Sequence, residues 1–324
     1  MSNILVTGGA GYIGSHTVYQ LLQRGYNVTV LDDLSTGFRD AVPEPRLHIC
    51  SLFDTEQVTQ LLVRQKIDAV VHFAAFIAVG ESTKEPEKYF TNNVAGSLSL
   101  FSAMAAAGVK KLVFSSTAAV YGNPVSTPIL ETAAIAPVNP YGETKATVER
   151  ALVWLDQCRG LRSVRLRYFN ACGANAEAGL SERHVPETHL IPLLLKAVVT
   201  GQPMTIFGTD YPTADGTCIR DYIHVDDLAA AHIAAIEHLL GDGASDVFNV
   251  GTGRGFSVRE VLAAVEKVTG KPVPHVFGDR REGDPAELVA DSSKLRSRLG
   301  WRPEYTELER IVASAWPSEQ RRWA

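Results

Sequence analysis

The most constraining feature of the sequence is a series of short apolar runs that alternate with helical patterns through its first half. The runs carry no polar alternation, which is typical of strands buried on both faces. They are Ile4–Thr7, Asn27–Leu31, Ala69–Phe73 and Lys111–Ser115. Helical patterns lie between and after them, at Gly11–Arg24, Asp54–Arg64, Lys84–Ala107 and Tyr141–Leu155. This alternation predicts an α/β fold with a doubly wound parallel sheet.

After about residue 170 the pattern changes, and Gly, Pro and Thr become frequent. Helical patterns persist at Asp226–Leu240 and after Ser257, where Ser257 and Glu260 form a capping box. We expect two domains, residues 1–170 and a smaller α/β domain of residues 171–324 over the carboxyl ends of the strands. Some segments of the second half are expected to return to the first domain. Ser318–Ala324 is expected to be a loose tail.

Charge and cysteine content exclude several classes of protein. The formal net charge is −5, so nothing suggests binding to nucleic acid or to an anionic membrane. No apolar run is long enough to span a bilayer, and the N-terminus lacks the pattern of a signal peptide. The four cysteines are far apart with no C-x-x-C pair, as in a reduced cytoplasmic protein.

A glycine-rich turn follows the first strand. Gly8, Gly11 and Gly14 form G-x-x-G-x-x-G, in which glycine allows a tight turn and a close approach of the backbone to a pyrophosphate. The following helix N-terminus offers free N–H groups to the same anion. The turn therefore predicts a dinucleotide site on a Rossmann-type sheet.

Asp32 ends the second strand, where an acidic side chain binds the adenosine ribose of a dinucleotide. A carboxylate there repels a 2′-phosphate, and no arginine immediately follows it. This position favours NAD over NADP.

The segment that contains Tyr141 and Lys145 has the spacing Y-x-x-x-K. If Pro140 opens a helix, both side chains lie on one face. A free tyrosine has a pKa of about 10, and a nearby ammonium favours its phenolate. Thr117 follows the strand Lys111–Ser115 at its carboxyl end and could complete a proton path. We therefore expect Thr117, Tyr141 and Lys145 to be catalytic.

Further motifs carry a family resemblance over nearly the whole chain. In the first half they are His72–Ala75, Val79–Ser82, Asn92–Val94 and Arg167–Asn170; in the second they are Phe207–Thr213, Asp215–Thr217, Ile219–Val225 and Arg280–Asp284. With these motifs the sequence resembles the extended short-chain dehydrogenase/reductases, and within them the UDP-glucose 4-epimerases. The resemblance implies an isomerase that interconverts UDP-galactose and UDP-glucose by transient oxidation at C4, with bound NAD and Tyr141 as base.

The resemblance also implies which residues bind the cofactor and the substrate. The cofactor-binding set is Gly8, Gly11, Tyr12, Ile13, Gly14, Asp32, Asp33, Ser35, Thr36, Leu52, Phe73, Ala74, Ala75, Asn93, Tyr141, Lys145 and Phe169. The substrate-binding set is Thr117, Asn170, Leu190, Phe207, Arg220, Arg281, Asp284 and Leu288. Arg220 and Arg281 suit a diphosphate, since guanidinium groups match phosphate oxygens. No metal site is expected.

Four positions depart from common versions of the family. Ile77 stands where some members have Lys, and Ser51 stands where an Asp that contacts adenine is usual. Thr117 replaces a frequent Ser. Leu288 occupies a variable position that sets the room beside the sugar, so acceptance of N-acetylated sugars is left open.

Other activities are distinguished by single positions. Family dehydratases and decarboxylases need acidic groups after the threonine, and this chain has Ala118 and Ala119. Epimerisation of UDP-N-acetylglucosamine or UDP-glucuronate stays an alternative, as does, less favoured, a non-catalytic NAD sensor. His224, Asp226 and Asp227 could mimic metal ligands but are better read as a helix start. A homodimer through helices Lys84–Ala107 and Tyr141–Leu155 is expected by analogy.

Overall fold

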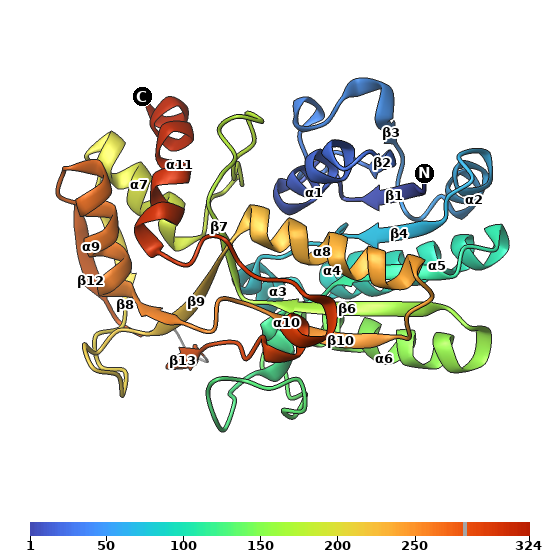
Figure 1. Ribbon diagram of the computed structural model, residues 1–324. Coiled ribbons are helices and arrows are strands. Elements are labelled where there is room, and N and C mark those ends of the chain that lie inside the picture. The colour runs from blue at the N-terminus through green and yellow to red at the C-terminus, as the bar shows by residue number, and fades with distance from the viewer. Residues whose placement is uncertain (281–283) are drawn as a thin grey trace.

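The computed structural model in Figure 1 describes residues 1–280 and 284–324 of the chain. Its centre is a seven-stranded sheet with the order β10-β6-β5-β4-β1-β2-β3, in which every pair is parallel. These strands are β1 (Asn3–Thr7), β2 (Asn27–Asp32), β3 (Leu47–Ile49), β4 (Ala69–His72), β5 (Lys111–Ser115), β6 (Arg162–Tyr168) and β10 (Asp246–Val250). The doubly wound parallel sheet is therefore confirmed.

Helices cover both faces of this sheet because its strands alternate between two apolar clusters. Ile4 and Val6 of β1 belong to the cluster beneath α1 and α8, whereas Leu5 belongs to the cluster beneath α2, α5 and α6. These helices are α1 (Tyr12–Gln23), α2 (Thr55–Arg64), α5 (Gly96–Ala107), α6 (Pro140–Arg159) and α8 (Val225–Leu240). The direction of winding changes between β1 and β4, and ligands of such sheets bind at the carboxyl ends there.

The second half of the chain forms two small sheets and a group of helices, seen at one end of Figure 1. Strand β9 pairs with β7, β11 and β13, and β12 pairs with β8. The strands are β7 (Asn170–Cys172), β8 (Met204–Phe207), β9 (Ile219–His224), β11 (Gly255–Ser257), β12 (His275–Gly278) and β13 (Glu287–Leu288). The helices at this end are α7 (Leu190–Thr200), α9 (Val258–Thr269) and α11 (Leu308–Trp323), whereas α10 (Ser293–Leu299) packs beside β10 and α8 of the large sheet. Strand β10 pairs within the large sheet and α8 packs on its face, so segments of the second half do return to the first domain. The domain boundary at residue 170 stays a prediction.

The predicted helix over Lys84–Ala107 is confirmed from Pro86 onward, but the chain breaks the helix at Glu85. The chain forms α3 (Val79–Lys84), α4 (Pro86–Tyr89), the π-helical segment η3 (Phe90–Ala95) and then α5. Glu85 has φ −129° and ψ 59°, because a residue before proline is pushed out of the helical region. Asn93 lies in the π-helical segment, and its side chain is hydrogen-bonded to Phe76 in the loop after β4.

The prediction of a loose tail at Ser318–Ala324 was also wrong. Helix α11 continues to Trp323, whose indole N–H donates to Glu319 over 2.7 Å. The guanidinium of Arg322 donates to the carbonyl oxygens of Glu182 and His184 over 2.9 Å and 2.7 Å. These contacts fix the C-terminal helix against a segment some 140 residues earlier in the chain.

Several predicted helix starts are confirmed. Asp54 caps α2 by accepting from the N–H of Gln57, and Ser257 and Glu260 form the expected capping box on α9. His224 caps α8 by accepting from the N–H of Asp226 over 3.0 Å. The remaining short helices are η1 (Arg39–Ala41), η2 (Glu44–Arg46) and η4 (Ala118–Tyr121).

Candidate active site

The glycine turn between β1 and α1 permits contacts that no other residue could make. Gly8 has φ +67°, and a Cβ there would lie 2.5 Å from the backbone nitrogen of Ala74. A Cβ on Gly14 would lie 2.2 Å from the carbonyl oxygen of Gly8. The cap of α1, Gly11, provides no side-chain hydrogen bond to the first turn. The turn therefore presents backbone to a ligand, as a dinucleotide diphosphate requires.

Asp32 is buried at the carboxyl end of β2 beside this turn. Its carboxylate accepts from the N–H of Ala10 over 2.9 Å and from that of Leu34 over 2.8 Å. Burial raises the pKa of the Asp32 carboxyl, and the two amide hydrogen bonds partly offset that effect. Asp33 accepts from the N–H of Ser35 in the following loop. The acid expected to bind a ribose thus also fixes the loop that would surround it.

The loop after β4 is fixed by Asn93. The side-chain oxygen of Asn93 accepts from the N–H of Phe76 over 2.9 Å, and its nitrogen donates to the Phe76 carbonyl over 3.0 Å. The same nitrogen donates to the hydroxyl of Thr144 on α6. Asn93 therefore connects the predicted cofactor loop, Phe73 to Ala75, with the helix that carries the predicted catalytic pair.

Tyr141 and Lys145 lie in the first turns of α6, which begins at Pro140 as predicted. Asn139 caps the helix by accepting from the N–H of Gly142 over 2.9 Å. Both side chains are buried, and the Lys145 ammonium donates to the carbonyl oxygen of Ser115 over 2.8 Å. The i, i+4 spacing places the two side chains on one face of the helix. Lys145 thereby reaches Ser115, the last residue of β5.

Without a bound ligand, the surroundings of this pair disfavour both the phenolate form of Tyr141 and the ammonium form of Lys145. Burial raises the pKa of the Tyr141 phenol, Tyr168 raises it further, and a hydrogen bond with Thr117 lowers it. Burial also lowers the pKa of the Lys145 ammonium to about 7, against the opposing effect of Glu149. A shifted acid–base pair in a buried position at the end of a sheet is typical of a catalytic site.

Thr117 caps the short helix η4 at the end of β5. Its hydroxyl accepts from the N–H of Ala119 over 3.1 Å and is hydrogen-bonded to Tyr141. The three predicted catalytic side chains are therefore brought together. They can pass a proton between a substrate hydroxyl and the tyrosine oxygen.

The predicted substrate residues lie on several elements of the second half. Arg220 on β9 pairs in register with Leu288 on β13, and Leu288 packs against the cluster that contains Phe169 and Ala118. Asn170 begins β7, Leu190 begins α7 and Phe207 ends β8. Arg281 lies outside the described residues.

Arg220 already has acceptors for its guanidinium. It forms an ion pair of 2.5 Å with the carboxylate of Asp284 and donates to the carbonyl oxygens of Ile219 and Pro285, both over 2.7 Å. Asp284 also accepts from the hydroxyl of Tyr211 over 3.4 Å. A diphosphate would have to take over some of these bonds from Arg220.

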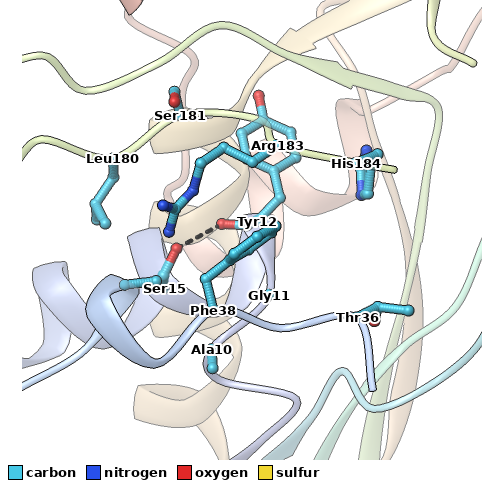
Figure 2. A pocket seen from close by; sticks show the side chains of 11 residues that line it. Ala10, Gly11, Tyr12, Ser15, Thr36, Phe38, Leu180, Ser181, Arg183 and His184 are labelled. Atoms are coloured by element: carbon cyan, nitrogen blue, oxygen red, sulfur yellow. Dashed lines mark hydrogen bonds between the residues drawn. The ribbon is translucent and has the colours of Figure 1, made fainter. Parts of the chain in front are cut away.

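A small cavity of about 40 Å³ lies at the start of α1. Figure 2 shows Ala10, Gly11, Tyr12 and Ser15 on one side, with Leu180, Ser181, Arg183 and His184 across from them. Arg183 forms two hydrogen bonds with Asp40, of 2.9 Å and 2.8 Å, and lies over the ring of Phe38. A segment of the second half thus covers the predicted diphosphate position.

Sequence reasoning missed this covering segment and the polar cluster that follows it. Glu182, His184, Glu187 and His189 each offer one ligand atom, and all four atoms lie within 4.8 Å of one another. The spacing E-x-H-x-x-E-x-H was a signal in the sequence, but a search for H-x-H and H-x-x-x-H patterns passes over it. His72, by contrast, is a core residue as expected, since both ring nitrogens lie within 2.9 Å of hydroxyl groups.

Two of the four departures from the family pattern, Ile77 and Ser51, lie in loops that follow strands of the large sheet. Ile77 is 40% exposed in the loop after β4. Because isoleucine is uncharged, this position does not supply the cation that a lysine would. Ser51 precedes the buried Leu52, and its hydroxyl accepts from the N–H of Phe53.

Among the described residues, no helix combines the length and apolar character needed to cross a membrane.

Comparisons with known proteins agree with this geometry. The model of the NAD dependent epimerase/dehydratase family matches residues 4–251. The UDP-glucose 4-epimerase of Lactobacillus helveticus is 50% identical over 315 residues, which cover 97% of this chain and 96% of that protein. The structure of UDP-glucose 4-epimerase from Brucella ovis in complex with NAD has a TM-score of 0.96 and 44% identity, covering 99% of both chains.

A second solved structure includes both kinds of ligand. It is UDP-glucose-4-epimerase from Stenotrophomonas maltophila with bound NAD and formylated UDP-arabinopyranose, with a TM-score of 0.96, 40% identity and 99% coverage of both chains. The glycine turn, the buried Tyr141 and Lys145 and these similarities over nearly the full length lead to one conclusion: the chain belongs to the NAD dependent epimerase/dehydratase family, within the extended short-chain dehydrogenase/reductases.

Proposed function

We propose that this protein is an NAD-dependent UDP-glucose 4-epimerase, which interconverts UDP-galactose and UDP-glucose. The observation that carries the proposal is the buried Tyr141, hydrogen-bonded to Thr117 and one helical turn from Lys145. It occurs in a chain half identical to UDP-glucose 4-epimerases over nearly its whole length. The glycine turn and Asp32 fit NAD, because Gly8 and Gly14 have no room for a Cβ and the carboxylate disfavours a 2′-phosphate.

The chain's own residues supply the proton chemistry and the positioning. NAD held at the glycine turn and Asp32 would supply reversible hydride chemistry at C4 of the sugar. Tyr141 would take the proton of the 4-hydroxyl, with Thr117 as the hydrogen-bonding partner of both oxygens. Lys145 would favour the phenolate through its charge, and Glu149 would favour the ammonium form of Lys145. Return of the same proton from Tyr141 would complete the cycle.

The residues after Thr117 disfavour elimination and decarboxylation, the other reactions that a 4-keto sugar can undergo. Elimination or decarboxylation needs an acid–base group near C5 or C6. The side chains that follow Thr117 are Ala118 and Ala119, which cannot transfer protons. The keto sugar would therefore be reduced again, with the nucleotide fixed by Arg220, Arg281 and Asp284 while the sugar turns.

We also propose that the protein acts in the cytoplasm as a homodimer through α5 and α6. Helix α6 exposes Trp154 by 66% and Val153 by 39%, and α5 exposes Leu98 by 43%. These are the apolar side chains that a dimer interface through the two helices would bury. Trp154→Glu should convert a dimer into monomers in light scattering after gel filtration, whereas Val276→Glu on β12, which is similarly exposed, should not. A wild-type monomer would contradict the proposal.

The activity is tested with purified protein and no added NAD. UDP-galactose, UDP-N-acetylgalactosamine and UDP-glucuronate are incubated separately, and the sugars are followed by NMR. Conversion of UDP-galactose into UDP-glucose is the expected result, and it would also show that NAD is retained from expression. The N-acetylated substrate reports the room beside Leu288. No change in UDP-galactose after addition of NAD would contradict the proposal.

A further inference from the structure

Four side chains between β7 and α7 form a compact set of metal-ligating groups. Glu182, His184, Glu187 and His189 lie within eight residues of one another, and His189 precedes the first residue of α7. One ligand atom from each lies within 4.8 Å of the other three. The set lies outside the group of Thr117, Tyr141 and Lys145, and the proposed reaction uses none of it.

The distances within this cluster are close to those of a four-coordinate site. The Nδ1 atoms of His189 and His184 lie 2.6 Å and 2.9 Å from Oε1 of Glu182. The same nitrogens lie 3.3 Å and 4.0 Å from Oε1 of Glu187. Ligands at about 2.0–2.1 Å from a tetrahedral zinc ion are roughly 3.4 Å apart. The four recorded distances each differ from this value by less than about 1 Å, so the atoms are close enough together to share one ion.

The cluster contains a buried polar atom that lacks a hydrogen bond. The side chains of Glu182 and Glu187 are only 4% and 2% exposed. Oε1 of Glu187 accepts from the N–H groups of Thr188 and His189. Oε2 has no hydrogen-bond partner among the described residues, and its nearest recorded cation is Nη1 of Arg322 at 3.6 Å. Buried carboxylate oxygens are usually hydrogen-bonded or bound to a metal.

We propose that Glu182, His184, Glu187 and His189 bind one zinc-like divalent cation. Two carboxylates balance the charge of the ion, and two imidazole nitrogens favour zinc, cobalt or nickel over magnesium or calcium. The ion would take the place of the protons between the two Nδ1 atoms and Oε1 of Glu182. Without it, the same side chains form a network of ion pairs, and the experiment below distinguishes the two arrangements.

The position of the cluster assigns the ion a structural role. His184 lines the cavity at the start of α1 together with Tyr12 (Figure 2). Its ring packs edge-on to that of Tyr12, with the centroids 6.1 Å apart. Arg322 of α11 donates to the backbone of Glu182 and His184 from the other side. A bound ion would therefore fix this covering segment between α1 and α11. The inference does not depend on which UDP-sugar the enzyme uses.

The test is a titration of tag-free, NAD-loaded protein with Co²⁺, followed by competition with Zn²⁺. The expected result is one Co²⁺ per chain with the visible absorption of a four-coordinate site, abolished by Zn²⁺. His189→Gln and Glu182→Gln should weaken binding by roughly 100-fold or more, because even outer partners of metal ligands are worth 10–100-fold. His275→Gln is the matched control, since His275 is also partly buried and bonded through Nδ1 to a backbone carbonyl; it should bind Co²⁺ normally.

X-ray absorption of the zinc-loaded wild type gives a second result that requires no variant to fold. The expected ligands are two imidazole nitrogens and two oxygens, with no sulfur. The proposal is overturned if the wild type binds neither ion, or if sulfur is found. It is also overturned if folded His189→Gln binds as tightly as the His275→Gln control. The sugar assay above is read separately, so failure of either proposal leaves the other intact.

Discussion

Glu149 lies one helical turn beyond Lys145 on α6, and its carboxylate opposes the effect of burial on the pKa of that lysine. Glu149 is itself fixed by Arg167, whose Nη2 lies 2.5 Å from Oε2, and by the hydroxyl of Ser116, also at 2.5 Å. The pair of Glu149 and Arg167 is buried. Glu149 thus favours the ammonium form of the proposed catalytic lysine, and its ion pair with Arg167 joins α6 to β6.

Glu149→Gln should strongly destabilise the protein. The change leaves the guanidinium of Arg167 buried without its counter-charge, and breaking a buried pair in this way costs about 3–5 kcal/mol. Urea unfolding in saturating NAD measures the loss in the free energy of unfolding. Glu143→Gln, on the same helix but in an exposed pair with Arg150, should cost less than about 1 kcal/mol. Equal losses in the two variants would contradict this account.

Tyr141→Phe should lower kcat by roughly 10²–10⁴-fold, because the proposed base is removed. The ring still fills its buried position, so the free energy of unfolding should change by only about 1 kcal/mol. Epimerisation rates and urea unfolding are measured together, with Tyr19→Phe on α1 as the control. A Tyr141→Phe variant with normal kcat would exclude Tyr141 as the base.

Gly8→Ala should abolish retention of NAD, whereas Gly25→Ala should not. Both glycines have positive φ, +67° and +82°, but only Gly8 has backbone atoms within 3 Å of the position of a Cβ. Backbone strain alone costs about 1–2 kcal/mol, so this loss in unfolding free energy is expected for Gly25→Ala. The steric clash at Gly8 adds to it. Chromatography of the nucleotide released from the purified proteins measures the NAD content, and equal content would contradict the proposed role of the turn.

His232 should contribute to acid destabilisation. Burial lowers the pKa of His232 to about 4, so the folded protein keeps it neutral while the unfolded chain protonates it near pH 6.5. Its stabilising effect is complete above pH 6.5 and is lost as pH falls toward 4. The free energy of unfolding should change by up to about 1.4 kcal/mol per pH unit from this group. His232→Leu should reduce the slope by that amount between pH 6.5 and 4; an unchanged slope would contradict the assignment.

The sequence predicted those parts of the site that depend on neighbouring residues. The turn at Gly8 to Gly14 and the start of α6 at Pro140 follow from local backbone preferences. The common face of Tyr141 and Lys145 follows from the period of a helix. Asp32 was placed because it ends a strand of the expected sheet.

Contacts between distant segments could not be predicted in this way. Arg167 meets Glu149 because β6 and α6 pack together, and the engagement of Arg220 by Asp284 depends on the register of β9 and β13. The same holds for Ser318–Ala324, which the sequence predicted as a loose tail but which Arg322 fixes through its contacts with Glu182 and His184. The break at Glu85 follows from Pro86 alone, because the residue before a proline avoids the helical region.

The central claim is that the C4 hydrogen leaves and returns within one active site while Tyr141 transfers only the hydroxyl proton. It is tested most directly with UDP-galactose that carries deuterium at C4, converted by the purified protein in ordinary water. NMR of the product should show UDP-glucose with deuterium retained at C4. UDP-glucose that contains hydrogen from water at C4 would contradict the account, because it would require proton rather than hydride transfer at that carbon.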